Sequence, residues 1–276
     1  MLPIYNCEAV QRFAAMGGIY GNVPALEACL NDAKTHQCES FLFLGDAIGC
    51  CGHSDEVVQQ LQQQFHVLIA GNHEQQAAAG LLTCGCGYAS PEDERLSCMA
   101  FAYAMEGLSE AHRQWLGTLP DAAILTTSAG RVLLCHGSPA QTNEFLYESE
   151  LSDRRLNQWL DEFDIVGFIC THSGLPWIRP LNNGRFAVNC GVVGKPDHDG
   201  DPAVHYALLT VADGQITATI QRVEYDYRAW AETLEQEGVD PIFIEPLRTG
   251  FWTTGVSSLP APQRQRSISR LSQFFD

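Results

Sequence analysis

Four polar clusters in this sequence each follow a short apolar run, and they contain residue types that bind transition metals. They are Gly45-Asp46, Gly71-Asn72-His73-Glu74, His136-Gly137-Ser138-Pro139 and Thr171-His172-Ser173-Gly174. Together they offer a carboxylate, an amide oxygen and imidazoles, a ligand set that suits Mn, Fe or Zn better than Ca. If the apolar runs are parallel strands, the clusters lie at the carboxyl edge of a sheet, where open α/β folds place their sites.

Each cluster on its own has an ordinary structural explanation. An Asp after a strand commonly caps a helix or forms a turn, and a single His is most often a satisfied structural residue. Four such clusters in succession, all at expected strand ends, favour one shared site over four independent turns.

The apolar runs and the segments between them predict an α/β fold. The expected strands are Phe13 to Met16, Phe41 to Leu44, Val67 to Ala70, Ala123 to Leu125, Val132 to Cys135, Val166 to Cys170, Phe186 to Asn189, Tyr206 to Val211 and Ile216 to Val223. Helices are expected after the first three strands, through most of residues 75–118, and over Asp153 to Phe163. The alternation of strand, polar turn and helix in the first half is typical of parallel βαβ units.

We expect one α/β domain over residues 13–225, preceded by a leader over residues 1–12 and followed by a helical and mobile extension over residues 226–276. A chain of 276 residues with 45% hydrophobic content is long enough for one substantial core. The N-terminus lacks the basic and apolar regions of a signal peptide, and no apolar run reaches the length of a membrane helix. A cytoplasmic location is therefore expected.

The formal net charge of −17 disfavours two classes of partner, because an acidic surface repels nucleic-acid backbones and anionic lipids. A small anionic substrate would need local positive charge, most simply a bound cation. The 11 cysteines are expected to be reduced thiols. A zinc site at Cys84-Gly85-Cys86 is disfavoured, because the second cysteine pair of a closed site is missing. The sequence does not indicate an oligomeric state.

The first three polar clusters, in their order, resemble the motifs of the calcineurin-like metallophosphoesterases, most closely those of the bacterial predicted phosphodiesterases in that superfamily. The segment from Gly21 to Ala28 is similar to the one that follows the family's first metal motif. The segment from Asn189 to Gly194 is similar to the family's late Asn-x-Gly-Ser-Val-Gly loop. The resemblance runs from about Phe13 to about Val223. It implies a four-layer αββα sandwich, in which helices flank two mixed sheets and the metals lie at the sheet ends.

The ligands of the family's first metal are largely missing. The family opens with Asp-x-His, where this chain has Gly18-Ile19-Tyr20, and it closes with Gly-His-x-His, where the final position is Gly174. The resemblance implies that the first metal keeps only the ligand it shares with the second, Asp46. Residues that could replace the lost ligands are Tyr20, Cys170, Asp197 and His198.

The ligands of the family's second metal are all present. By the resemblance they are Asp46, Asn72, His136 and His172. One divalent transition metal ion, Mn, Fe or Zn, is therefore expected, and a second ion is not.

The resemblance also implies catalytic roles for His73 and Glu74. His73 is expected to stabilise developing charge or to protonate the leaving oxygen, with its acidic neighbour orienting it. Lys195 and His53 are weaker candidates for contacts with substrate.

Two functions stay open at this point. One is a phosphoesterase that uses one metal ion on a small phosphomonoester or phosphodiester. The other is a catalytically impaired descendant that binds a metal or another ligand. A dinucleotide-binding fold is excluded, because no expected strand is followed by a Gly-x-Gly-x-x-Gly helix entry.

Overall fold

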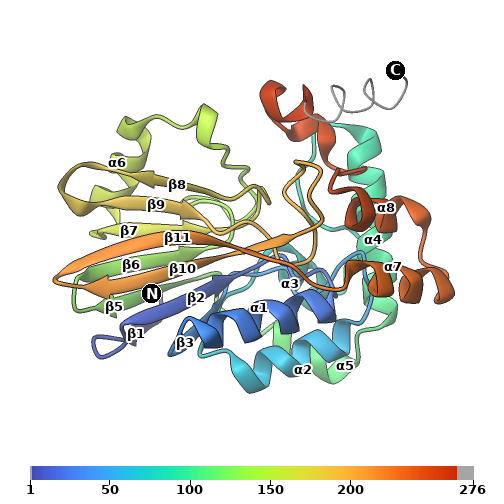
Figure 1. Ribbon diagram of the computed structural model, residues 1–276, viewed down its shortest axis with the longest axis horizontal. Helices are drawn as coiled ribbons and strands as arrows, with labels where there is room; N and C mark the ends of the chain where they lie inside the picture. The colour runs from blue at the N-terminus through green and yellow to red at the C-terminus, as the bar shows by residue number, and fades with distance from the viewer. Residues whose placement is uncertain (1, 266–276) are drawn as a thin grey trace.

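Two β-sheets packed face to face form the centre of the molecule (Figure 1). The computed structural model describes residues 2–265. The six-stranded sheet contains, in spatial order, β1 (Ile4–Asn6), β5 (Ala122–Thr127), β6 (Gly130–Cys135), β7 (Gly167–Cys170), β9 (Phe186–Asn189) and β8 (Trp177–Pro180). The five-stranded sheet contains β11 (Gln215–Val223), β10 (Val204–Ala212), β2 (Arg12–Met16), β3 (Ser40–Phe43) and β4 (Val67–Leu68). Each sheet has both parallel and antiparallel pairs, so the prediction of two mixed sheets is confirmed.

Side chains that alternate along the strands fill the space between the sheets. On β2, Phe13 and Ala15 lie in this inner core, while Ala14 and Met16 face the helices on the other side. Leu134 on β6 enters the inner core from the opposite sheet. Because successive residues of a strand point to opposite faces, a strand that is covered on both faces must be apolar throughout. This is why the central strands stand out in the sequence as continuous apolar runs.

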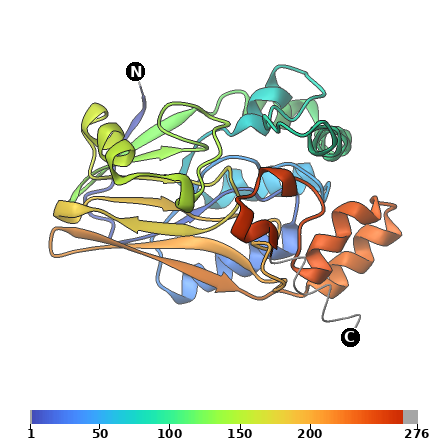
Figure 2. The same ribbon diagram turned by 90° about the horizontal axis from the view of Figure 1, so that it is seen from above.

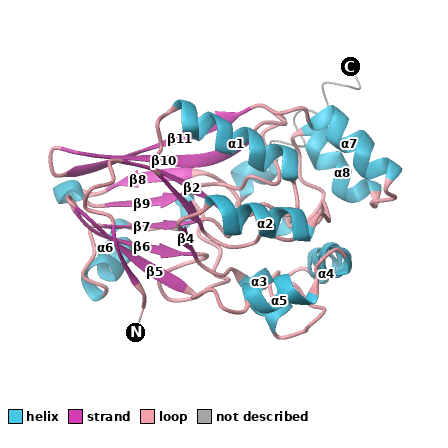
Figure 3. Cartoon of the chain, turned by 90° about the horizontal axis from the view of Figure 1, so that it is seen from below, coloured by secondary structure: helices cyan, strands magenta, loops and turns pink. Residues whose placement is uncertain are grey.

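Helices cover both outer faces of the sheets, which confirms the predicted four layers (Figure 3). Helices α1 (Val23–Thr35) and α2 (Ser54–Gln64) pack on the five-stranded sheet, and α6 (Asp153–Glu162) packs on the six-stranded sheet. Five further helices gather beyond one end of the sheets (Figures 1 and 2): α3 (Asn72–Ala78), α4 (Pro91–Glu106), α5 (Glu110–Leu116), α7 (Tyr227–Gln236) and α8 (Pro241–Thr249). Short 3₁₀ helices lie at Glu148–Glu150, Asn182–Gly184 and Val256–Ser258.

The structure adds two edge strands that the sequence did not reveal. The expected leader contains β1, which pairs in parallel with β5 and sets Ile4 opposite Ile124. Strand β8 pairs with β9 and ends at Pro180, a residue that sheets tolerate at their edges. Both strands are too short to show an alternating pattern in the sequence. Each forms by pairing with another strand: β1 with β5, far along the chain, and β8 with β9, beyond a turn.

The C-terminal segment packs onto the domain. Helices α7 and α8 share a small apolar core with Cys51. Beyond α8, in the segment expected to be mobile, Trp252 and Leu259 are only 7% and 1% exposed. Residues 266–276, which the same expectation included, lie outside the described residues. Within residues 2–265, every helix is too short or too polar to cross a lipid bilayer.

The same substitution, Leu to Ala, should lower the free energy of unfolding much more in the inner core than at the surface. Leu42 on β3 is fully buried between the sheets, whereas Leu82 is 67% exposed. Leu42→Ala should lower the free energy of unfolding by about 2–5 kcal/mol, through lost burial and the cavity left behind. Leu82→Ala should change it by less than about 0.5 kcal/mol. Equilibrium unfolding in urea measures both, and equal effects would contradict the assigned inner core.

Candidate functional site

The turn after β3 places Asp46 at the end of the sheet in a constrained conformation. Asp46 has a φ angle of +64° and follows Gly45 at +97°. A Cβ atom on Gly45 would lie 2.4 Å from the backbone nitrogen of Gly71 and 2.6 Å from Nδ1 of His136, so no larger residue fits there. Three of the polar clusters therefore meet at this point. Positive φ angles in residues other than glycine are uncommon and collect at functional sites.

Glu74 holds this turn in place. Its buried carboxylate accepts hydrogen bonds from the backbone N–H groups of Asp46 at 2.7 Å, Ala47 at 2.8 Å and Gly71 at 2.7 Å. The expectation that Glu74 orients His73 is wrong, because the Nδ1 atom of His73 donates instead to the carbonyl oxygen of Ile48 at 2.7 Å. Glu74 is thus a positioning residue for the Asp46 turn.

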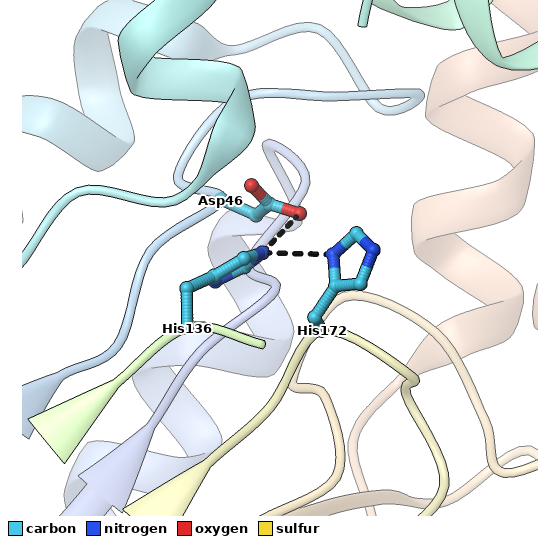
Figure 4. A group of neighbouring side chains, drawn as sticks. All are labelled: Asp46, His136 and His172. Atoms are coloured by element: carbon cyan, nitrogen blue, oxygen red, sulfur yellow. Dashed lines mark hydrogen bonds and ion pairs between the residues drawn. The ribbon is translucent and has the colours of Figure 1, made fainter. Parts of the chain in front are cut away.

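Asp46, His136 and His172 converge on one buried point (Figure 4). Their ligand atoms all lie within 4.8 Å of one another. The Nε2 atom of His136 is 3.4 Å from Oδ2 of Asp46 and 3.0 Å from Nδ1 of His172. The structure therefore brings together three of the four predicted ligands.

Each of the two imidazoles uses one ring nitrogen to donate to a backbone carbonyl, so its other nitrogen carries a lone pair that faces the second ring. His136 uses its Nδ1–H to donate to the carbonyl oxygen of Leu44 at 2.6 Å, and His172 uses its Nε2–H to donate to that of Cys86 at 3.3 Å. The remaining nitrogens, 3.0 Å apart, can face each other only with a proton or a cation between them. Two nitrogens bound to one ion at about 2.1 Å and at right angles would lie about 3.0 Å apart, so the pair fits a metal ion.

Asn72 supplies an oxygen that needs a partner. Its Nδ2 donates to the carbonyl oxygen of Cys84 at 2.7 Å, which fixes the orientation of the amide. Within residues 2–265, the buried Oδ1 has no hydrogen-bond partner. A buried oxygen in this state is costly unless a cation or a donor meets it. The amide is therefore suited to be the fourth ligand.

The pKa shifts of Asp46 and His172 favour the forms that bind a metal. Burial would raise the pKa of Asp46, but the charges of His136 and His73 outweigh it and hold this pKa well below its usual range. Burial and the charge on His136 lower the pKa of His172 to about 3, so its imidazole is neutral near pH 7. An ionised carboxylate and a neutral imidazole are the forms that bind a metal.

The turn that carries His172 is fixed by the late glycine-containing loop. Asn189 donates from Nδ2 to Oγ of Ser173 at 2.8 Å and accepts from the N–H of Gly191 at 2.9 Å. Thr171 donates from its hydroxyl to the carbonyl oxygen of Gly191. This explains why an Asn-x-Gly segment far along the chain belongs to the site.

A cavity opens to solvent from this point. Its polar lining includes Asp46, His73, His172 and Lys195. Its lining from the C-terminal segment consists of Phe243, Pro246, Leu247, Thr253 and Thr254.

Other side chains close two of the positions where the family resemblance expects first-metal ligands. A Cβ atom on Gly18 would lie 2.3 Å from Cγ1 of Val192, and one on Gly174 would lie 3.0 Å from the ring of Trp252. Tyr20 lines the cavity, and burial together with the charge of Asp46 raises the pKa of its phenol well above the usual value. A phenolate ligand at Tyr20 is therefore disfavoured.

The other proposed replacements point elsewhere. Cys170 packs in the apolar core under α6, where burial raises the pKa of its thiol. Asp197 and His198 do not line the cavity, and Nδ1 of His198 accepts a hydrogen bond from the backbone N–H of Trp252 at 2.8 Å. None of these three residues is placed to restore the first metal.

The two weaker substrate candidates differ in position. Lys195 lies on the cavity wall. His53 does not line this cavity, and its ring nitrogens instead contact the carboxylates of Glu56 at 3.2 Å and Glu237 at 2.9 Å. The expectation that His53 contacts substrate is therefore not supported by its position.

Sequence reasoning missed the cavity lining from the C-terminal segment, and it also missed Cys86 and Trp252. Cys86 lines the cavity and lies 3.5 Å from Nε2 of His73, and only its place in a cysteine cluster marked it out. Trp252 closes the position of Gly174 from the C-terminal segment, and no local pattern could have placed it there.

A separate thiol cluster lies beside the cavity. Cys84, Glu94 and Cys98 offer ligand atoms within 4.8 Å of one another. Glu94 and Cys98 are one helical turn apart on α4. Metal counts on this protein should therefore be made with the cluster disabled by Cys98→Ser.

Comparisons with known proteins agree with this architecture. A model of the family described as calcineurin-like phosphoesterase matches residues 11–213. The uncharacterized protein MJ0912 of Methanocaldococcus jannaschii is 24% identical over 232 residues, which cover 78% of this chain and 88% of that protein.

Two solved structures share the fold. The metallophosphoesterase from Sphaerobacter thermophilus superposes with a TM-score of 0.68 and 25% identity, covering 87% of this chain and 99% of that one. The hypothetical protein PH1004 from Pyrococcus horikoshii OT3 superposes with a TM-score of 0.70 and 19% identity, with the same coverage of 87% and 99%.

Removing one imidazole should remove the metal. In a Cys98→Ser background, protein dialysed against Mn should retain about one ion per chain, and His172→Ala should weaken binding about a hundredfold or more. His36→Ala, at a histidine that is 41% exposed, is the matched control. Elemental analysis by mass spectrometry gives the count, and an unchanged count in His172→Ala would contradict the assigned centre.

Glu74→Gln tests the positioning role of the carboxylate. The substitution keeps the shape but turns an NH₂ group toward backbone N–H donors, which should cost about 1–3 kcal/mol of folding free energy. It should also weaken Mn binding, because the Asp46 turn loses its support. Glu92→Gln, on an exposed side chain, should change neither quantity. Thermal unfolding with and without Mn measures both effects.

Proposed function

Because the chain belongs to the calcineurin-like phosphoesterase family, we propose that it hydrolyses a small phosphomonoester or phosphodiester with one divalent metal ion. The observation that carries this proposal is the convergence of Asp46, His136 and His172 next to a cavity that Asp46, His172 and His73 line. The orphaned amide oxygen of Asn72 completes the expected ligand set. Mn, Fe and Zn suit these ligands.

A divalent ion bound there would polarise a phosphoryl oxygen and lower the pKa of a bound water. The chain's own residues supply the remaining functions. The apolar wall on α8 gives room for the group attached to the phosphate and limits the access of bulk water. The acidic surface favours a small substrate over nucleic acid or a membrane.

His73 is suited to proton transfer. In hydrolysis a water oxygen bonds to phosphorus, the ester P–O bond breaks, and the leaving oxygen takes up a proton. Burial lowers the pKa of His73, but the charge of Asp46 and the hydrogen bond to Ile48 outweigh it and raise the pKa above its usual value. Since Nδ1 is committed to Ile48, Nε2 is the atom that would give up the proton.

A second candidate function is a non-catalytic metal- or ligand-binding protein. The observation in its favour is that Val192 and Trp252 close the positions of the lost ligands at Gly18 and Gly174. An ion kept only for stability would have no use for a cavity-facing histidine beside it, so the presence of His73 favours the hydrolase.

The test is turnover of an aryl phosphate and of its bis-ester with added Mn. The wild type should hydrolyse at least one of them, and His73→Ala should lower kcat by about 10²- to 10⁴-fold while leaving the metal content unchanged. His66→Ala, at a histidine outside the cavity, is the control. One bound ion with no turnover of either ester would support the binding protein instead.

A further inference from the structure

A lysine lies where the first metal of the family has lost its ligands. The Cβ position of Gly174 is 3.8 Å from Cε of Lys195. The Nζ atom of Lys195 is 3.6 Å from the centre of the Trp252 ring and 5.8 Å from that of the Tyr20 ring. The ammonium group therefore lies beside two of the three positions from which ligands have been lost.

The ring over the lysine is firmly anchored. Trp252 donates from Nε1 to the carbonyl oxygen of Pro196 at 2.6 Å and from its backbone N–H to Nδ1 of His198 at 2.8 Å. Both partners follow Lys195 closely in the chain, so the ring and the lysine form one local unit. A cation over an indole face is attracted by the ring electrons. Trp252 thus restricts where the ammonium can go.

Among residues 2–265, the ammonium group has no carboxylate partner of its own. Within residues 2–265, no carboxylate lies within 4.0 Å of Nζ and no oxygen accepts a hydrogen bond from it. The side chain is half-buried and faces the cavity that holds Asp46 and His172. Burial lowers the pKa of Lys195 to about 8, so most of the ammonium is still protonated near pH 7. A partly desolvated charge of this kind favours the binding of an anion.

We propose that Lys195, held by Trp252 and Tyr20, forms a binding site for a phosphoryl oxygen in the pocket that the first metal ion occupies in the family. The inference rests on the proposed function, because it assumes that phosphate enters this cavity. Lysine binds phosphate as a point charge and can stabilise the negative charge of the transferring group. It cannot hold a water as a metal does, so it takes over only the charge-stabilising part of the lost ion's role.

Phosphate binding tests this site without requiring turnover. Inorganic phosphate is titrated into the Zn-loaded Cys98→Ser protein by calorimetry. Lys195→Met keeps an unbranched side chain that is one atom shorter and removes the charge, and it should weaken phosphate binding at least about tenfold without changing the Zn content. Lys34→Met, at the other lysine of the chain, is a matched control and should bind as the parent does.

Because the chain has two lysines, NMR spectroscopy of their side chains can report phosphate binding at Lys195 directly. In ¹⁵N-lysine-labelled protein, phosphate should shift the side-chain resonance of Lys195 and leave that of Lys34 in place. Unchanged affinity in Lys195→Met, no shift at Lys195, or no phosphate binding by the parent would each overturn the proposed site. Phosphate binding that depends on Lys195, in a protein that hydrolyses neither ester, would support the site and count against the hydrolase.

Discussion

The carboxylate of Glu74 is the interaction on which the site depends. It collects three backbone N–H groups from two separate turns, one at the end of β3 and one at the end of β4. Those contacts support the left-handed conformation of Asp46, and the tight approach of Gly45 to Gly71 and His136 follows from the same turn. Without this buried carboxylate, the three backbone N–H groups would lack acceptors. The turn that carries Asp46 would then lose the support that holds Asp46 beside the two histidines.

The site combines positive charge from two sources within a strongly acidic chain. Asp46, His136 and His172 form a candidate site for a divalent ion, and Lys195 adds a positive charge to the lining of the adjoining cavity. Because the net charge of the chain is −17, an anionic ligand approaches against the overall field and is attracted only at short range. Such a field would discriminate against large polyanions more than against a single phosphate group.

The sequence predicted the elements whose side chains are buried on both faces, and the turns that follow them. Continuous apolar runs identify β2, β3, β7 and β9 because these strands are covered on both faces. Strand-end position and residue type single out the clusters that contain Asp46, His136 and His172, and the family resemblance assigns these residues as ligands. The role of Glu74 could not be derived, because its partners are backbone atoms that carry no sequence signal. The place of Trp252 could not be derived either, since it depends on how the C-terminal segment returns to the sheet ends.

Two glycines at the sheet ends, Gly18 and Gly174, tolerate no larger side chain. A side chain at position 18 would overlap Val192 at 2.3 Å, and one at position 174 would press on Trp252 at 3.0 Å. Gly18 and Gly174 also have φ angles of +55° and +74°, which larger residues rarely adopt. A larger residue at either position would therefore destabilise the protein. Metal-binding side chains could enter there only together with changes at the neighbouring residues Val192 and Trp252.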